Sequence, residues 1–274
     1  DWSSDVCSAE RPGPDGPSDP TGAPRAVRRT PSSATAYAHP RRRLSDSWVN
    51  DASARSVSTP DAAASGPAGH DMNWRDVYGG EQVWSGNPND ALIAVLTKQL
   101  ADLSPGRALD VGCGEGADAI HLAEQGWQVT ALDVAAPALE RGRAAAEVSG
   151  DDVASRITWV CAGLLDAALA PESFDLVSVF YPALLRTEDQ SIERSLRDLV
   201  RPRGALIVVA HAHVDRDRAL EHGFDPDSYV TIADVVARLG EGWQIEQFES
   251  ERHVTEGAGA HHQADIVLIA RRSD

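Results

Sequence analysis

Short apolar runs alternate with longer amphipathic stretches from residue 72 to the end of the chain. The apolar runs have the length of buried strands, and the stretches between them carry apolar residues at helical spacing. This alternation is typical of a parallel sheet covered by helices on both faces. Seven strands are predicted, over residues 107–111, 127–134, 156–162, 174–180, 205–213, 243–250 and 264–272.

The first predicted helix begins after a cap at Asn87, with Pro88 in its first turn, and ends before Pro105. Other helices are predicted over residues 115–126, 136–150, 188–204 and 231–240.

The connection over residues 251–263 has no helical pattern and contains turn-forming glycines. A parallel return would need a long crossover, usually a helix, so we expect a hairpin and an antiparallel last strand. The predicted fold class is therefore α/β, with a Rossmann-like, doubly wound, seven-stranded, mostly parallel sheet and helices on both faces. Residues 72–274 are expected to form a single domain.

The first 71 residues have a different composition from the rest. They hold nine of the sixteen prolines, no Ile, Phe or Met, and only five Val or Leu. That is too little apolar surface to offset the entropy of ordering the chain. The only methionine, Met72, stands where this composition ends. We therefore expect a native start at Met72, and residues 1–71 to be either a disordered extension or an artefact of gene assignment.

The charge and the cysteines narrow the class of protein. The formal charge is −17, and residues 1–71 are nearly neutral, so the predicted domain carries almost all of it. Such a body would repel the phosphates of nucleic acids and anionic membranes. Cys7, Cys113 and Cys161 have neither metal nor redox spacing. With no apolar run of spanning length and no signal-peptide pattern, the expected location is the cytoplasm.

Candidate chemistry is concentrated between two predicted strands, in the stretch "LDVGCGEG". Asp110 lies near the end of the first strand, and Gly112, Gly114 and Gly116 follow it. Glycines let the backbone approach a ligand closely, and the next helix presents free N–H groups. Asp133 ends the second strand, beside this loop. In a doubly wound sheet, ligands bind at this position.

A dinucleotide is one ligand that fits part of this pattern. Gly112, Gly114 and Ala117 satisfy its glycine fingerprint, and Asp133 has the spacing of a ribose-binding acid. Asp110 argues against it, because a carboxylate beside a pyrophosphate is repulsive. A ligand with an ammonium and a sulfonium group would be attracted instead.

These residues resemble the glycine loop of class I methyltransferases that use S-adenosylmethionine. The resemblance implies that Asp110, the loop glycines and the backbone of Cys113 hold the methionine part, while Asp133 and the adjacent Val134 contact the ribose. The side chains of Cys113 and Glu115 are expected to have no role. The family usually has an acidic residue after strand three, where this chain has Gly163. Asp166 could replace it or be an ordinary loop residue, and Leu164 and Leu165 are expected to cover the adenine.

The acceptor site is expected beside the ends of strands four and five. Tyr181 follows strand four, His211 and His213 end strand five, and His262 lies in the last hairpin. Tyr181, His211 and His262 are the candidate catalytic residues, as a general base or as clamps on the substrate. No metal site is predicted, because these imidazoles lack a carboxylate or thiolate at ligand spacing.

An aromatic segment precedes the first helix, with Trp74, Tyr78 and Trp84. It resembles the amino-terminal cap of thiopurine- and tellurite-resistance-type methyltransferases. Ring faces there, that of Trp84 included, could attract a sulfonium by cation–π interaction, or the segment could simply pack on the sheet edge.

The preferred hypothesis is an S-adenosylmethionine-dependent transfer of a methyl group to a heteroatom of a small molecule by in-line displacement. The alternatives are a cofactor-binding module without catalysis and an NAD-linked oxidoreductase. The sequence predicts no nucleic-acid or membrane partner and leaves the oligomeric state open.

Overall fold

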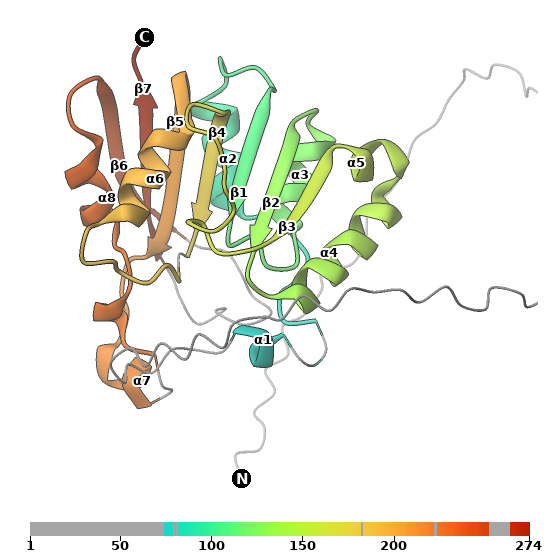
Figure 1. The fold of residues 1–274 in the computed structure, drawn as a ribbon, viewed down its shortest axis with the longest axis horizontal. Coiled ribbons are helices and arrows are strands. Elements are labelled where there is room, and N and C mark those ends of the chain that lie inside the picture. The colour runs from blue at the N-terminus through green and yellow to red at the C-terminus, as the bar shows by residue number, and fades with distance from the viewer. Residues whose placement is uncertain (1–73, 79, 81, 182, 222–223, 252–263) are drawn as a thin grey trace, which may run out of the picture. The chain divides into compact units, whose positions relative to one another are not determined.

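One seven-stranded sheet forms the centre of the fold (Figure 1). The computed structural model describes residues 74–78, 80, 82–181, 183–221, 224–251 and 264–274. The strands are β1 (Arg107–Val111), β2 (Gln128–Asp133), β3 (Ile157–Cys161), β4 (Phe174–Phe180), β5 (Val200–His211), β6 (Trp243–Glu251) and β7 (Ala264–Arg272). Their order is β3-β2-β1-β4-β5-β7-β6.

The pairing confirms the predicted mixed sheet. Strands β1 to β5 run parallel, and β7 is antiparallel to both β5 and β6. The order of the strands reverses at β1, whose two neighbours are β2 and β4. The residues that follow β1 therefore lie at the switch point, where the fold class places ligands.

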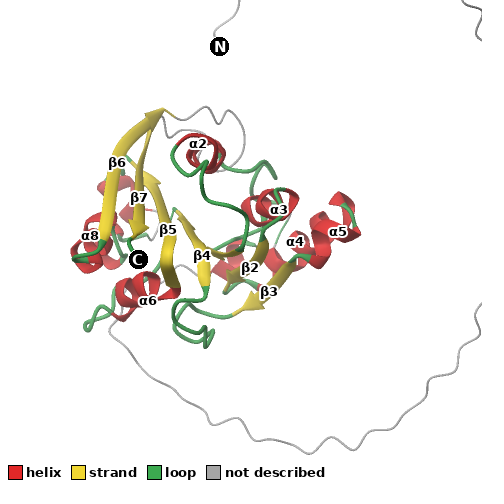
Figure 2. Cartoon of the chain, turned by 90° about the horizontal axis from the view of Figure 1, so that it is seen from above, coloured by secondary structure: helices red, strands yellow, loops and turns green. Residues whose placement is uncertain are grey.

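Helices cover both faces of the sheet. They are α1 (Trp74–Val77), α2 (Asp90–Lys98), α3 (Ala117–Glu124), α4 (Ala136–Ser149), α5 (Asp151–Ser155), α6 (Ser191–Leu199), α7 (Arg216–Glu221) and α8 (Ile232–Leu239), with a 3-10 turn at Pro226–Ser228. Helices α2 and α3 lie on one face, and α6 and α8 on the other (Figure 2). Within the described ranges, no helix is both long enough and apolar enough to cross a membrane.

The two-residue period of the strands assigns each side chain to one of these faces. In β5, Ile207 and Val209 belong to the apolar cluster that includes α2 and α3. Leu206 and Val208, which alternate with them, belong to the cluster that includes α6 and α8. Both faces of β5 are buried, which explains its nearly continuous apolar sequence.

Polar residues near the strand ends obey the same alternation. Asp110, Asp133, Ser178, His211 and Asp265 each lie an even number of residues from a strand residue of the α2 and α3 cluster. Five strands therefore contribute polar side chains to one face of the sheet.

Two predicted boundaries are wrong. The helix predicted over 188–204 ends at Leu199, and β5 begins at Val200, which is fully buried and pairs with Phe174 of β4. Pro202 could not have continued a helix. The cap of α2 is Asn89 rather than Asn87, because the Asn89 side chain accepts a hydrogen bond from the N–H of Ala91. The short helices α5 and α7 were not predicted.

The indole of Trp159 packs β3 against α3 and α4. A Cβ atom added at Gly116 would lie 2.4 Å from this ring, and one added at Gly142 would lie 2.6 Å from it. Glycine at these two positions therefore leaves the space that the ring fills.

Gly142→Ala should destabilise the protein by about 1 to 3 kcal/mol, although alanine normally favours a helix over glycine. The added methyl group would collide with a rigid ring. Chemical denaturation would measure the loss, and Trp159→Phe, which removes the far atoms of the indole, should reduce it. A stabilising Gly142→Ala would contradict this packing.

Candidate functional site

The glycine loop connects β1 to α3 at the switch point of the sheet. Gly112, Gly114 and Gly116 have φ values of +71°, +53° and +80°, in the left-handed region that glycine adopts readily. The N–H groups of Gly112 and Cys113 donate to the carbonyl of Leu132, at 2.8 and 3.0 Å. The loop is thus bound to the end of β2 and brought beside Asp133.

Asp110 is buried beneath this loop, with 3% of its surface exposed. The Ser178 hydroxyl, on β4, donates to its Oδ1 at 3.2 Å. Its Oδ2 is buried and has no hydrogen-bond partner among the described residues. Burial, and then the charges of Asp118 and Asp133, raise the pKa of Asp110 well above its ordinary value. A cation in this crevice would favour the ionised carboxylate.

Asp133 connects the glycine loop to the turn after β2. Its Oδ2 accepts from the N–H of Gly114 and its Oδ1 from that of Ala135, both at 2.8 Å. Burial nevertheless raises its pKa. Each carboxylate oxygen can accept a further hydrogen bond, so the group can hold the loop and bind a ligand hydroxyl. Val134, the next residue, is exposed.

Asp118 is a third carboxylate in this crevice, and the sequence analysis missed it. It lies in the first turn of α3, where an acidic residue is common because it favours the helix dipole. Its Oδ1 accepts from the N–H of Asn89 at 2.6 Å. Burial raises its pKa to about 6, and its charge acts on Asp110. Asp110, Asp118 and Asp133 together form an acidic crevice.

Residues 74–78, 80 and 82–89, which we call the cap segment, pack against the glycine loop. The hydroxyl of Tyr78 accepts from Trp84 Nε1 at 2.8 Å, and it lies 2.8 Å from where a Cβ of Gly114 would be. Burial raises the pKa of Tyr78 to about 12, so its phenol stays neutral. Trp84 is 39% exposed. The two rings therefore lie beside the glycine loop, and a role as a cap over the cofactor stays a prediction.

Glu115 connects the cap segment to the loop, so the expectation that its side chain has no role is wrong. It accepts from the N–H groups of Val83 and Trp84, at 3.1 and 3.0 Å, and from Arg141 Nε at 2.7 Å. Arg141, on α4, also donates to the carbonyls of Tyr78 and Gly80, both at 3.0 Å. Arg141 is 26 residues away in the chain, and no local pattern signals this pairing.

Leu164 and Leu165, which follow β3 and were both expected to cover the adenine, differ in their exposure. Leu164 is buried in the cluster of the α6 and α8 face, whereas Leu165 is 48% exposed. A Cβ added at Gly163 would lie 2.9 Å from Asp166 Oδ2. The carboxylate of Asp166 therefore reaches the place where a side chain of residue 163 would begin.

A second group of polar side chains lies where β4 and β5 end and β7 begins. The hydroxyl of Tyr181 donates to Asp265 Oδ2 at 2.7 Å, and His211 Nδ1 lies 3.2 Å from Asp265 Oδ1. The rings of Tyr181 and His211 are stacked, with centroids 4.4 Å apart. Tyr181 has a φ of +50°, a strained conformation for a residue other than glycine. Of these three residues, the sequence analysis did not single out Asp265, because it lies within a predicted strand.

His213, a further histidine near the end of predicted strand five, is not part of this group. His213 lies beyond the end of β5 and is exposed. His262 lies outside the described residues, and its role stays a prediction. In the described part of the chain, no group of three or more His, Cys, Asp or Glu side chains could hold a metal ion.

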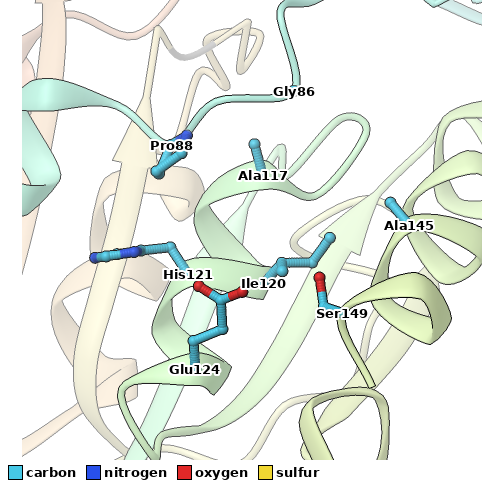
Figure 3. A pocket seen from close by; sticks show the side chains of 8 residues that line it. All are labelled: Gly86, Pro88, Ala117, Ile120, His121, Glu124, Ala145 and Ser149. Atoms are coloured by element: carbon cyan, nitrogen blue, oxygen red, sulfur yellow. The ribbon is translucent and has the colours of Figure 1, made fainter. Parts of the chain in front are cut away.

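A hollow of about 180 Å³ lies between α3 and α4 (Figure 3). Ile120, His121 and Glu124 of α3 line it, with Ser149 of α4 and the nearby Pro88. None of the three crevice carboxylates lines it. We therefore locate the candidate site by its chemistry and not by this hollow.

Asp118→Asn should stabilise the ligand-free protein more at about pH 7.5 than at about pH 5. The folded-state pKa of about 6 lies above the ordinary value of 3.8, so the folded protein retains a proton that the unfolded chain releases. Stability from this group is therefore lost as the pH rises through about 6. Denaturation measures the stabilisation by Asp118→Asn as a change in unfolding free energy. This change should be larger at the higher pH by about 1 to 3 kcal/mol. An equal effect at both values would contradict the raised pKa.

Arg141→Met should loosen the cap segment, because it leaves the carboxylate of Glu115 without its cation. Acrylamide should then quench Trp84 more strongly, measured as the difference between proteins with and without Trp84→Phe. Stability should fall by about 1 to 3 kcal/mol. Arg143→Met, at an exposed position on the same helix, is the matched control. Equal quenching in both variants would show that Arg141 does not hold the segment.

Comparison with known proteins identifies a family. Residues 108–204, from β1 into β5, match the family model of a methyltransferase domain. The tRNA 5-carboxymethoxyuridine methyltransferase of Escherichia coli K12 is 34% identical over 123 residues, covering 43% of this chain and 46% of the relative. An uncharacterized methyltransferase of Mycobacterium bovis is 36% identical over 131 residues, covering 47% and 61%. The chain spans about half the length of these curated relatives.

The fold agrees with this family. N-methyltransferase NodS from Bradyrhizobium japonicum WM9, solved with S-adenosyl-L-homocysteine, has a TM-score of 0.56 at 17% identity, over 76% of this chain and all of that one. The finer resemblance to thiopurine- and tellurite-resistance enzymes stays a prediction. The matched domain, the relatives and the fold support a class I methyltransferase that uses S-adenosylmethionine.

Proposed function

We propose that this chain transfers the methyl group of S-adenosylmethionine to a heteroatom of a small molecule. The observation that carries the proposal is the buried Oδ2 of Asp110, an acceptor without a partner among the described residues, in a crevice with two more carboxylates. An ammonium ion supplies both a hydrogen-bond donor and a positive charge. When bound, the cofactor supplies a sulfonium whose methyl group can be displaced in line.

The residues around the loop fit the parts of this cofactor. Asp110 would accept from its ammonium, and the N–H groups in the first turn of α3 favour its carboxylate. Asp133 would accept from the ribose hydroxyls. Leu165 is exposed and can cover the adenine, and Asp166 offers the carboxylate that Gly163 lacks. Trp84, which is 39% exposed and bonded to the Tyr78 hydroxyl at the loop, presents aromatic surface to which a sulfonium would be attracted.

Neither alternative explains the site equally well. A dinucleotide would bring a pyrophosphate beside Asp110 and Asp118, which is unfavourable in a buried crevice. A binding module without catalysis has no need of the strained Tyr181 or of the Asp265 contacts beside it.

The charge of the chain favours a small acceptor over a nucleic acid. One relative acts on tRNA, as its name states. This chain has a formal charge of −17, and a phosphate backbone would be repelled unless a basic surface met it. A neutral or cationic small molecule meets no such barrier.

Asp110→Asn should weaken S-adenosylmethionine binding by about 10-fold or more, because it replaces a charge-assisted hydrogen bond by a neutral one. Isothermal titration calorimetry would measure the dissociation constant. Asp151→Asn, at an exposed acidic residue of α5, should leave it unchanged. The wild-type protein should not bind NADH. NADH binding with S-adenosylmethionine excluded would overturn the proposal.

The acceptor class requires a separate measurement. Formation of S-adenosylhomocysteine should be followed with phenols, thiols and amines, and in parallel with unmodified tRNA. Turnover of a small molecule with none on tRNA supports the proposal. Turnover on tRNA alone would correct the acceptor, and cofactor binding without any turnover would favour the binding module.

A further inference from the structure

We propose that His211 is a general base for the methyl acceptor, that Asp265 is its positioning residue, and that the acceptor is therefore a nucleophile that still carries a proton. This inference rests on the proposed function and adds to it the substrate class and one residue that the sequence did not indicate.

The first support is the geometry of the pair. His211 ends β5 and Asp265 lies opposite it in the antiparallel pairing with β7. Asp265 is 3% exposed, and its Oδ1 lies 3.2 Å from His211 Nδ1. An ionised carboxylate can only accept, so this contact assigns the proton to Nδ1 and makes Nε2 the basic nitrogen.

The second support is that the other oxygen of Asp265 is engaged as well. Tyr181 donates to Oδ2 at 2.7 Å while its ring stacks on the imidazole. One buried carboxylate therefore orients both aromatic side chains. The φ of +50° at Tyr181 shows that the backbone after β4 adopts a strained conformation to place this ring.

The third support is a short connection from this group to the acidic crevice. Asn89 Nδ2 donates to the hydroxyl of Tyr181 at 3.2 Å, while the backbone N–H of Asn89 donates to Asp118 at 2.6 Å. Asp118 acts electrostatically on Asp110. A single residue thus separates Tyr181 from the crevice proposed for the cofactor, so His211 lies on the acceptor side of that crevice.

This arrangement favours acceptors that must lose a proton when they are methylated. The heteroatom of a neutral acceptor forms a bond to the methyl carbon, the carbon–sulfur bond breaks, and its electron pair stays on sulfur as the neutral thioether. The proton of the acceptor passes to His211 Nε2 and then to solvent, so charge and atoms balance. A phenol, a thiol or an ammonium ion needs this step. A halide ion does not, because it has no proton to lose.

The test compares acceptors that differ in protonation. Wild-type protein, His211→Gln, Asp265→Asn and Tyr181→Phe are assayed for S-adenosylhomocysteine formation with 4-methylphenol, 2-mercaptoethanol and benzylamine, which keep their protons near neutral pH. The same proteins are assayed with 2,4-dinitrophenol and 4-nitrothiophenol, which are already ionised, and with iodide. His213→Gln, two residues along the chain and exposed, is the matched control.

Wild type should methylate at least one of the protonated acceptors. His211→Gln should lower kcat by about 100-fold or more for that acceptor and by much less for the ionised one of its class. It should also abolish the acid limb of the pH–rate profile. Asp265→Asn should shift that limb, which a purely structural defect would not do, and thermal unfolding confirms that the variant is folded. Tyr181→Phe should keep the limb and mainly change KM.

Three results would overturn the inference. They are an equal loss for both kinds of acceptor in His211→Gln, turnover of iodide alone, and cofactor binding without turnover of any of these acceptors. Failure of the wild-type protein to bind S-adenosylmethionine in calorimetry would instead overturn the proposed function. The binding measurement thus separates the two failures.

Discussion

The burial of an acidic group at the end of β1 is the constraint on which the site depends. An ionised carboxylate without a cation is strongly disfavoured inside a protein, so Asp110 either keeps its proton or meets a positive charge. Asp118 and Asp133 make the second solution more favourable, since they add negative charge to the same crevice. The cationic cofactor of the family matches this electrostatic requirement, and a phosphate-rich cofactor does not.

Because side chains alternate between the two faces of the sheet, the site extends beyond β1 to several strands. Residues from five strands present polar side chains to the face that α2 and α3 cover. Asn89, at the start of α2, contacts both Asp118 and Tyr181. The groups proposed for the cofactor and for the acceptor are therefore parts of one layer. A shift of α2 would move both, which gives its N-cap residue, Asn89, a role beyond starting a helix.

The chain differs from the usual family pattern after β3. Gly163 stands where the family usually has an acidic residue, and Asp166 Oδ2 lies 2.9 Å from where a Cβ atom of residue 163 would be. The cap segment is held by Glu115 and Arg141, a partly buried ion pair whose carboxylate also accepts from backbone N–H groups. Removing one partner would leave the other poorly compensated, and this explains why the segment lies closely on the loop.

The sequence by itself determined the fold class, the seven strands, the antiparallel last strand and the loop with Asp110 and Asp133, because these depend on local periodicity and on residues close together in the chain. It also singled out Tyr181 and His211, which follow strands at the edge where ligands bind. Only the tertiary structure decided that Glu115 meets Arg141, that Asp118 joins the crevice and that Asp265 holds Tyr181 and His211. These partners are separated by 26 residues in the first case and by 84 and 54 in the last. Such contacts arise from strand pairing and helix packing, and a short stretch of sequence carries no local pattern for them.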